Sequence, residues 1–195
     1  MKALVGYATH DGHTRIIAER IGARIAEEGH TVDVRDVADL PRDVTLESYD
    51  VVILGAPVRS GKHLSRMRKF ARLHREHLQR RPSAFFSCGL TSSQQTEEAR
   101  RTARELVDAF IDDTGWRPDH VDVFAGALLY RKYNFIVRAV MKAISRKAGG
   151  DTDTSRDYDY TRWDEVDAFA HDVAAHLMDA APRRRPPEPA RPRTP

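Results

Sequence analysis

Hydrophobic residues along the chain form short runs typical of strands, separated by longer stretches with helical spacing. Residues 3–7, 51–56 and 83–88 are mostly apolar, which predicts strands covered on both faces of a sheet. Residues 31–37 alternate apolar and polar side chains, as in a strand close to a sheet edge. A run at residues 121–127 predicts a fifth strand.

The stretches between these runs place apolar residues on one face of a helix. Ile17, Ile21 and Ile25 form one such stripe. A last helix is expected to begin at Thr161, with Asp164 at capping-box spacing. Because strands and helices alternate throughout, we expect an α/β fold in which a doubly wound, five-stranded parallel sheet carries helices on both faces.

One connection breaks the regular alternation. The segment 128–160, which follows the fifth strand, is far longer than the ~2 to 6 residues usual between a strand and a helix. Within it, residues 134–147 have the spacing of an amphipathic helix. Its apolar stripe is Ile136, Val140 and Ile144, and its basic stripe is Arg138, Lys142 and Arg146. We expect this insertion to be functional.

Charge is distributed unevenly along the 195 residues. The net charge is +3, but residues 123–150 hold six basic residues and no acidic one, while residues 182–195 hold five arginines and one glutamate. An acidic body therefore carries a basic segment, which predicts contact with something anionic such as lipid, nucleic acid or a carboxylate substrate. We expect residues 1–181 to form one domain and the Pro- and Arg-rich residues 182–195 to be a disordered tail.

The single cysteine, Cys88, rules out an internal disulfide and a cysteine-based zinc site. The sequence starts directly in strand residues without a signal peptide, and no apolar run approaches the ~20 residues that cross a bilayer. We therefore expect a cytoplasmic protein, with peripheral contact at the cytoplasmic membrane face as a further expectation.

Residues 8–14 join the first strand to the first helix and resemble a phosphate cradle. Thr9 and Thr14 offer hydroxyl groups, Gly12 lets the backbone come close, and the helix start offers unpaired N–H groups. The loop has no lysine or arginine, which argues against the P-loop of nucleotide hydrolases. The alternative is an ordinary turn in which Thr and Asp residues cap the helix.

Two further loops, 57–61 and 88–93, are expected at the same edge of the sheet, where open α/β sheets bind ligands. With these three loops, residues 2–178 resemble the flavodoxin-like proteins, whose phosphate loop reads Ser/Thr-x-Thr-Gly-x-Thr. Asp11 departs from that pattern, because flavodoxins usually have Thr there. A carboxylate would weaken the phosphate site unless Asp11 turns outward and caps the helix.

Five sequence blocks narrow the resemblance. They are residues 9–14, 82–87, 116–119, 125–130 and 149–154, which read THDGHT, PSAFFS, WRPD, AGALLY and GGDTDT. In this order, with the long insertion in the same place, they are similar to the flavodoxin-like, FMN-dependent protoporphyrinogen IX dehydrogenases (menaquinone-type protoporphyrinogen oxidases). The resemblance implies FMN as cofactor, protoporphyrinogen IX as substrate, and a quinone, menaquinone or ubiquinone, as electron acceptor in haem biosynthesis.

The resemblance also implies site residues. The residues expected around FMN are Thr9, His10, Asp11, Gly12, His13, Thr14, Pro57, Val58, Arg59, Ser60, Gly61, Ser87, Cys88, Gly89 and Leu90. Those expected to meet substrate or membrane are Tyr130, Arg131, Lys132, Tyr133, Arg138 and Lys142. The flavin carries the redox chemistry, so no catalytic acid–base pair is assigned.

Several roles stay open from the sequence. His10 and His13 add charge to the phosphate if protonated, or are ordinary surface residues. Cys88 is expected to be a packed, unreactive thiol. The insertion helix docks on anionic lipid, covers the flavin and holds the substrate propionates, or packs its apolar face on the sheet.

Three other functions compete with the dehydrogenase. A flavodoxin-type electron carrier would have no substrate of its own, and a flavin-dependent quinone reductase would be fed by NAD(P)H. An Arg-rich nucleic-acid binder is disfavoured because no recognition module accompanies the tail, so no specific nucleic acid is expected as a partner. The oligomeric state is left undetermined.

Overall fold

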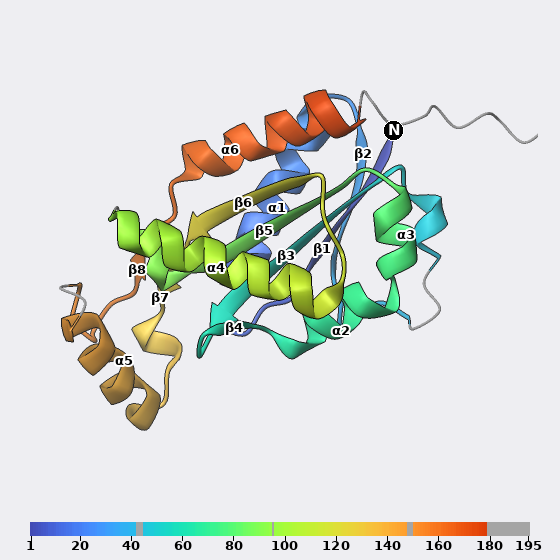
Figure 1. Cartoon of the computed structure of the whole chain (residues 1–195). Helices are drawn as coiled ribbons and strands as arrows, with labels where there is room; N and C mark the ends of the chain where they lie inside the picture. The colour runs from blue at the N-terminus through green and yellow to red at the C-terminus, as the bar shows by residue number, and fades with distance from the viewer. Residues whose placement is uncertain (42–44, 95, 148–149, 179–195) are drawn as a thin grey trace, which may run out of the picture.

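A parallel sheet forms the centre of the protein (Figure 1). The computed structural model describes residues 1–41, 45–94, 96–147 and 150–178, so the expected tail at 182–195 lies outside the described residues. The parallel strands are β1 (Lys2–Tyr7), β2 (Thr31–Asp36), β3 (Val51–Arg59), β5 (Ser83–Gly89) and β6 (His120–Ala125). They lie in the order β2-β1-β3-β5-β6, and each neighbouring pair is parallel. The expected doubly wound, five-stranded sheet is confirmed.

Helices cover both faces of the sheet, as expected (Figure 1). One face carries α1 (His13–Glu27) and α6 (Trp163–Asp172), which continues into the π-helical η4 (Val173–Met178). The other face carries α2 (Ser65–Leu73), α3 (Arg75–Arg80) and α4 (Glu97–Thr114). The helices that follow β1 and β3 therefore lie on opposite faces of the sheet. This places the switch point of the sheet at the carboxyl ends of these two strands.

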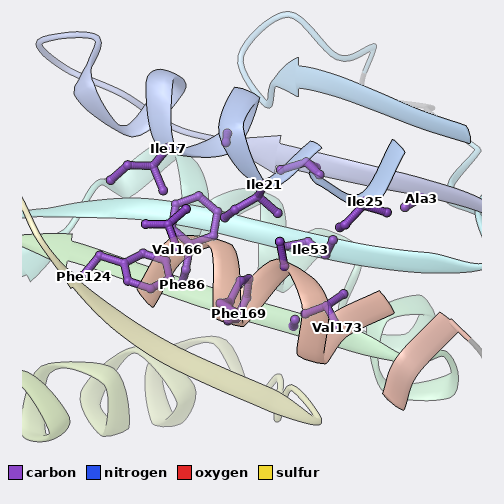
Figure 2. Packing of buried hydrophobic residues seen from close by; sticks show 14 of the residues in the cluster. Ala3, Ile17, Ile21, Ile25, Ile53, Phe86, Phe124, Val166, Phe169 and Val173 are labelled. Carbon is purple, nitrogen blue, oxygen red and sulfur yellow. The ribbon is translucent and has the colours of Figure 1, made fainter. Parts of the chain in front are cut away.

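Side chains that alternate along each strand supply the two cores. Toward α1 and α6, Ile17, Ile21 and Ile25 meet Val166 and Phe169 over the sheet (Figure 2), and all five are at most 1 % exposed. Burial of each such side chain contributes about 1.5–3 kcal/mol. The opposite core is aromatic and contains Phe85, Phe110 and Trp116. Both cores hold the strand ends, and thus the loops that follow them, in fixed positions.

The segment after β6 extends away from the central sheet, and a short pair of strands joins its two ends. Its elements are β7 (Ala127–Leu128), η3 (Tyr130–Lys132), α5 (Phe135–Lys147) and β8 (Tyr158–Asp159). The strands β7 and β8 form an antiparallel pair, and α5 lies beyond the carboxyl ends of the central strands (Figure 1). The predicted helix at 134–147 is thus present, with Asn134 as its cap: the Asn134 side-chain oxygen accepts the Val137 N–H at 2.9 Å.

Two local expectations were wrong. The loop 57–61 is part of a hairpin, because β3 continues to Arg59 and pairs with β4 (Lys62–His63). Thr161 does not cap the last helix: α6 begins after Arg162 without a side-chain cap, and the Thr161 hydroxyl donates instead to the carbonyl of Ala125 at 3.0 Å. Tertiary contacts outweighed the local capping pattern in that case.

Candidate functional site

A pocket of about 460 Å³ opens at the carboxyl ends of the strands. Its walls come from the loops after β1, β3, β5 and β6 and from one face of α5. The three loops expected to converge do so, and the insertion closes the pocket from the opposite side. This volume lies within the range of about 300–1,000 Å³ typical of small-molecule sites.

The loop after β1 turns into α1 at Gly12, which has a left-handed φ of +91°. The Thr9 hydroxyl oxygen accepts the Gly12 N–H at 2.9 Å, so the proton of that hydroxyl remains available for an anion. The first helical hydrogen bond runs from Ile16 N–H to Gly12 C=O, which leaves the amides before Ile16 without a helical partner. These donors and the helix dipole form a site suited to a phosphate group.

Asp11 does not cap the helix. Its carboxylate lies 2.7 Å from Nδ1 of the neighbouring His10, and the N-cap residue Gly12 has no side-chain bond. The carboxylate is thus paired beside the loop, and both Asp11 and His10 line the pocket. The alternative in which the Asp11 carboxylate caps the first N–H groups of α1 was wrong.

His13 is the first residue of α1, and its neighbours determine which ring nitrogen carries a proton. Its Nε2 lies 2.7 Å from the Thr161 hydroxyl, whose proton goes to Ala125, so Nε2 must be the donor. Burial lowers the pKa of His13, the nearby Lys132 lowers it further, and Asp159 opposes both. The neutral ring anchors the loop to the end of the insertion. The alternative in which a protonated His13 adds positive charge to the phosphate site is therefore not supported.

The second wall is the tip of the β3–β4 hairpin. Ser60 and Gly61 both have positive φ, +49° and +74°, as in the tight turns that suit a twisted hairpin. Pro57, Val58, Arg59, Ser60 and Gly61 all line the pocket. Arg59 therefore brings a cation to this wall.

The third wall follows β5. Cys88, Gly89, Leu90 and Thr91 line the pocket, and the chain then enters η2 (Leu90–Ser93). Cys88 is 3 % exposed, lies 3.3 Å from the Thr14 hydroxyl, and has its thiol pKa raised by burial to about 11. Burial with so high a pKa describes a packed and unreactive thiol.

Ser87 lies elsewhere. Because side chains alternate along a strand, it points to the α2–α4 face, where its hydroxyl lies 2.8 Å from Nε2 of the buried His63. It is 1 % exposed and is not among the pocket residues. Of the residues predicted around the cofactor, Ser87 is thus held in the core, while Gly12 shapes the loop through its backbone.

The turn η3 starts the insertion and is held from three directions. Tyr130 is fully buried and donates its hydroxyl to the Asp151 carbonyl at 2.8 Å. The Arg138 guanidinium donates to the carbonyls of Tyr130 and Tyr133, both at 3.1 Å. The Arg131 N–H donates to the Asp157 carboxylate at 2.8 Å. Tyr130 and Arg138 are predicted to meet substrate or membrane, and in the structure both side chains form hydrogen bonds within the insertion.

The remaining predicted residues of the insertion are distributed around the pocket. Tyr133 lines it and is half-buried, and burial raises its pKa. Arg131 and Lys142 have exposed side chains. Lys132 reaches back to the phosphate loop, where its Nζ donates to the Asp11 carbonyl at 2.6 Å. This contact joins residues far apart in the chain, and no local pattern could have indicated it.

The apolar face of α5 forms the last wall. Ile136, Val137, Val140, Met141 and Ile144 line the pocket. Ile136, Val140 and Ile144 are still 59 %, 52 % and 53 % exposed, so this face does not pack on the sheet. The sequence interpretation that buried the stripe against the sheet was wrong. Exposed apolar residues beside a cavity are typical of a surface that binds a ligand or partner.

The residues of this pocket fit FMN. Loop amides and the Thr9 hydroxyl suit a phosphate group, while Val58, Leu90 and the α5 face suit a flat apolar ring. Among the described residues, no group of three or more His, Cys, Asp or Glu is placed to hold a metal ion. Within the same part of the chain, no helix has the length and apolar character to span a membrane.

Comparison with known proteins agrees with the fold. The family model of the flavodoxin domain matches residues 4–155. A flavodoxin from the domain Archaea superposes with a TM-score of 0.54 at 20 % identity, covering 91 % of this chain and 99 % of that one. Oxidised Flavodoxin 1 from Bacillus cereus gives a TM-score of 0.51 at 17 % identity, with the same coverage. The fold and the pocket thus define a flavodoxin-type protein.

Sequence relatives are more specific. Protoporphyrinogen IX dehydrogenase (quinone) of Escherichia coli K12 is 36 % identical over 179 residues, which is 92 % of this chain and 97 % of that protein. The enzyme of the same name from Leishmania major is 36 % identical over 183 residues, 93 % of this chain and 78 % of that protein. The chain belongs to the protoporphyrinogen IX dehydrogenase (quinone) family of flavodoxin-like proteins.

Proposed function

We propose that this protein binds FMN and oxidises protoporphyrinogen IX to protoporphyrin IX, with a quinone as electron acceptor. The observation that carries the proposal is the composition of the pocket. Flavodoxin-type loops form one side of it, and an exposed apolar helix from the insertion forms the other. A phosphate cradle facing a broad apolar wall suits a cofactor and a large apolar ring bound together.

The loop residues would hold FMN at its phosphate and at its isoalloxazine ring. The amides that start α1, with the Thr9 hydroxyl, would bind the phosphate. The hairpin tip at 57–61 and residues 88–91 would flank the isoalloxazine ring. FMN bound there would supply the redox chemistry between the porphyrinogen and the quinone. The chain's own residues bind, orient and shield the reactants.

The insertion would bind the substrate. The α5 face offers Ile136, Val140 and Ile144 to the apolar macrocycle, and Tyr133 lies at the same opening. Arg131 and Lys142 of the same insertion are exposed and would pair with the two propionates. A ring held between α5 and the loops excludes water from the flavin side of the pocket.

The quinone, menaquinone or ubiquinone, would reach the same opening from a lipid surface. Phe135, at the start of α5, is 81 % exposed, and basic residues lie on both sides of it in the sequence. Apolar and cationic side chains on one exposed helix suit peripheral contact with an anionic membrane. Sedimentation with vesicles containing anionic lipid tests this contact, and Phe135→Glu should weaken it. Sedimentation unaffected by that substitution would contradict the membrane contact.

The reaction is tested by turnover. Purified protein loaded with FMN is mixed anaerobically with protoporphyrinogen IX, and porphyrin fluorescence is followed with and without added quinone. Sustained porphyrin formation that requires quinone is expected. A yellow protein that forms no porphyrin would contradict the dehydrogenase and favour an electron carrier. Failure to bind FMN at all would contradict both.

A further inference from the structure

We propose that Lys132, which belongs to the insertion, positions the phosphate of FMN and so makes the insertion part of the cofactor site. The inference rests on the proposed function only through the identity of the cofactor. Lys132 acts on the phosphate through the loop that it holds and through its charge.

The contact is direct and specific. Nζ of Lys132 donates to the Asp11 carbonyl at 2.6 Å, in the middle of the phosphate loop. A Cβ built on Gly12 would lie 3.4 Å from the same Nζ, so the ammonium group also lies against the left-handed residue that begins α1. Lys132 thereby fixes the two residues whose backbone directs the loop amides. Lys132 does not itself line the pocket, so it reaches the phosphate through the loop backbone and through its charge rather than by direct contact.

A positive charge beside this loop would favour a bound phosphate. The loop 8–14 contains no lysine or arginine, and Asp11 adds a carboxylate beside it. His13 is kept neutral by burial, with its Nε2 proton committed to Thr161. Lys132 therefore supplies, from outside the loop, a charge that favours the phosphate and offsets Asp11.

Several hydrogen bonds fix the backbone of the turn that carries Lys132. Tyr130 is fully buried two residues earlier, and Arg138 ties the carbonyls of Tyr130 and Tyr133 on both sides of Lys132. The Lys132 N–H itself donates to the Leu129 carbonyl at 3.0 Å. These bonds fix the backbone of the turn, and the bond from Nζ to the Asp11 carbonyl fixes the far end of the side chain.

The test compares two flavins that differ only in the phosphate. Full-length protein is freed of flavin, and dissociation constants for FMN and for riboflavin are measured from the quenching of flavin fluorescence. Lys132→Met should weaken FMN about ten- to a hundredfold, the effect of losing a charge-assisted contact, and leave riboflavin unchanged. Lys132→Arg should retain most of the FMN affinity. Lys69→Met, the matched loss of an exposed lysine that does not line the pocket, should change neither constant.

Two results would overturn the inference. One is an unchanged FMN constant in Lys132→Met, and the other is an equal loss of FMN and riboflavin, which would mean a general structural role. A wild-type chain that binds neither flavin would overturn the proposed function together with this inference. A wild-type chain that binds FMN through Lys132 but forms no porphyrin would support the inference and overturn only the proposed reaction.

Discussion

The ring of His13 and the hydroxyl of Thr161 lie 2.7 Å apart, although the two residues are separated by 148 positions in the chain. Thr161 follows the returning strand of the insertion, and its hydroxyl also donates to the last residue of β6, Ala125. One buried threonine thus joins the phosphate loop, the edge strand and the insertion. These two hydrogen bonds link the three elements next to the pocket.

Replacement of Thr161 by Val should lower the free energy of unfolding by about 1–3 kcal/mol. The substitution keeps the shape but leaves the Ala125 carbonyl and the His13 N–H without a buried partner. Urea unfolding monitored by tryptophan fluorescence measures the change. Thr31→Val, at an exposed strand position, is the control and should stay within about 0.5 kcal/mol of wild type. Equal stability of the two variants would contradict the role given to Thr161.

The stability of the protein should depend on pH through His63. Burial, and to a lesser degree Arg68, lowers the pKa of His63 from 6.5 to about 4. A lowered folded-state pKa means that the folded protein holds the neutral ring. The contribution of His63 is therefore complete above pH 6.5 and is lost as the pH falls toward 4, by up to about 3 kcal/mol.

The measurement compares unfolding free energies between pH 4 and 7 for wild type and His63→Gln. The variant should lack this part of the acid-induced loss, while His171→Gln, which removes an exposed histidine, should retain it. Parallel pH profiles for wild type and His63→Gln would show that His63 does not titrate as the structure indicates.

Cys88 should resist thiol reagents in the folded protein. It is 3 % exposed, and its pKa of about 11 keeps it protonated near neutral pH. Labelling with a chromogenic disulfide reagent at pH 8 should be slow in buffer and rapid in denaturant, with one thiol per chain. Fast labelling of the native protein would show that the pocket opens at Cys88.

A charge on the inner face of α5 should impair turnover without releasing FMN. Val140→Asp places a carboxylate on the pocket wall, where the apolar macrocycle is proposed to lie, and should slow porphyrin formation at least tenfold. Ala139→Asp adds the same charge next to it on an exposed position outside the pocket residues, and should have little effect. Similar rates for the two variants would argue against substrate binding on this face.

Much of the fold follows from local patterning. Continuous apolar runs placed β3 and β5 in the middle of the sheet, and the alternating run placed β2 at its edge, because burial on one or both faces dictates which positions are apolar. The three loops were found for the same reason: each follows a strand, and parallel strands end at one edge. The resemblance at residues 9–14 then indicated a phosphate ligand.

The contacts of Thr161 and Arg138 could not be predicted from the sequence, because they join residues of different elements. The spacing of Thr161 and Asp164 is that of a capping box, yet the Thr161 hydroxyl serves a carbonyl on another element. Arg138 belongs to a basic stripe by its spacing, but two backbone carbonyls bind its guanidinium. Periodicity identifies the face of a helix on which a residue lies, and it does not identify what that face will meet.

The central claim is that flavin in this pocket takes electrons from protoporphyrinogen IX bound against α5. Anaerobic rapid mixing of FMN-loaded protein with protoporphyrinogen IX, without quinone, tests it most directly. The account predicts that the yellow absorbance of the flavin bleaches as porphyrin fluorescence rises at the same rate, and that Val140→Asp slows both while its FMN stays bound. Flavin that remains oxidised in the wild-type protein, with substrate present and FMN in place, would contradict the account.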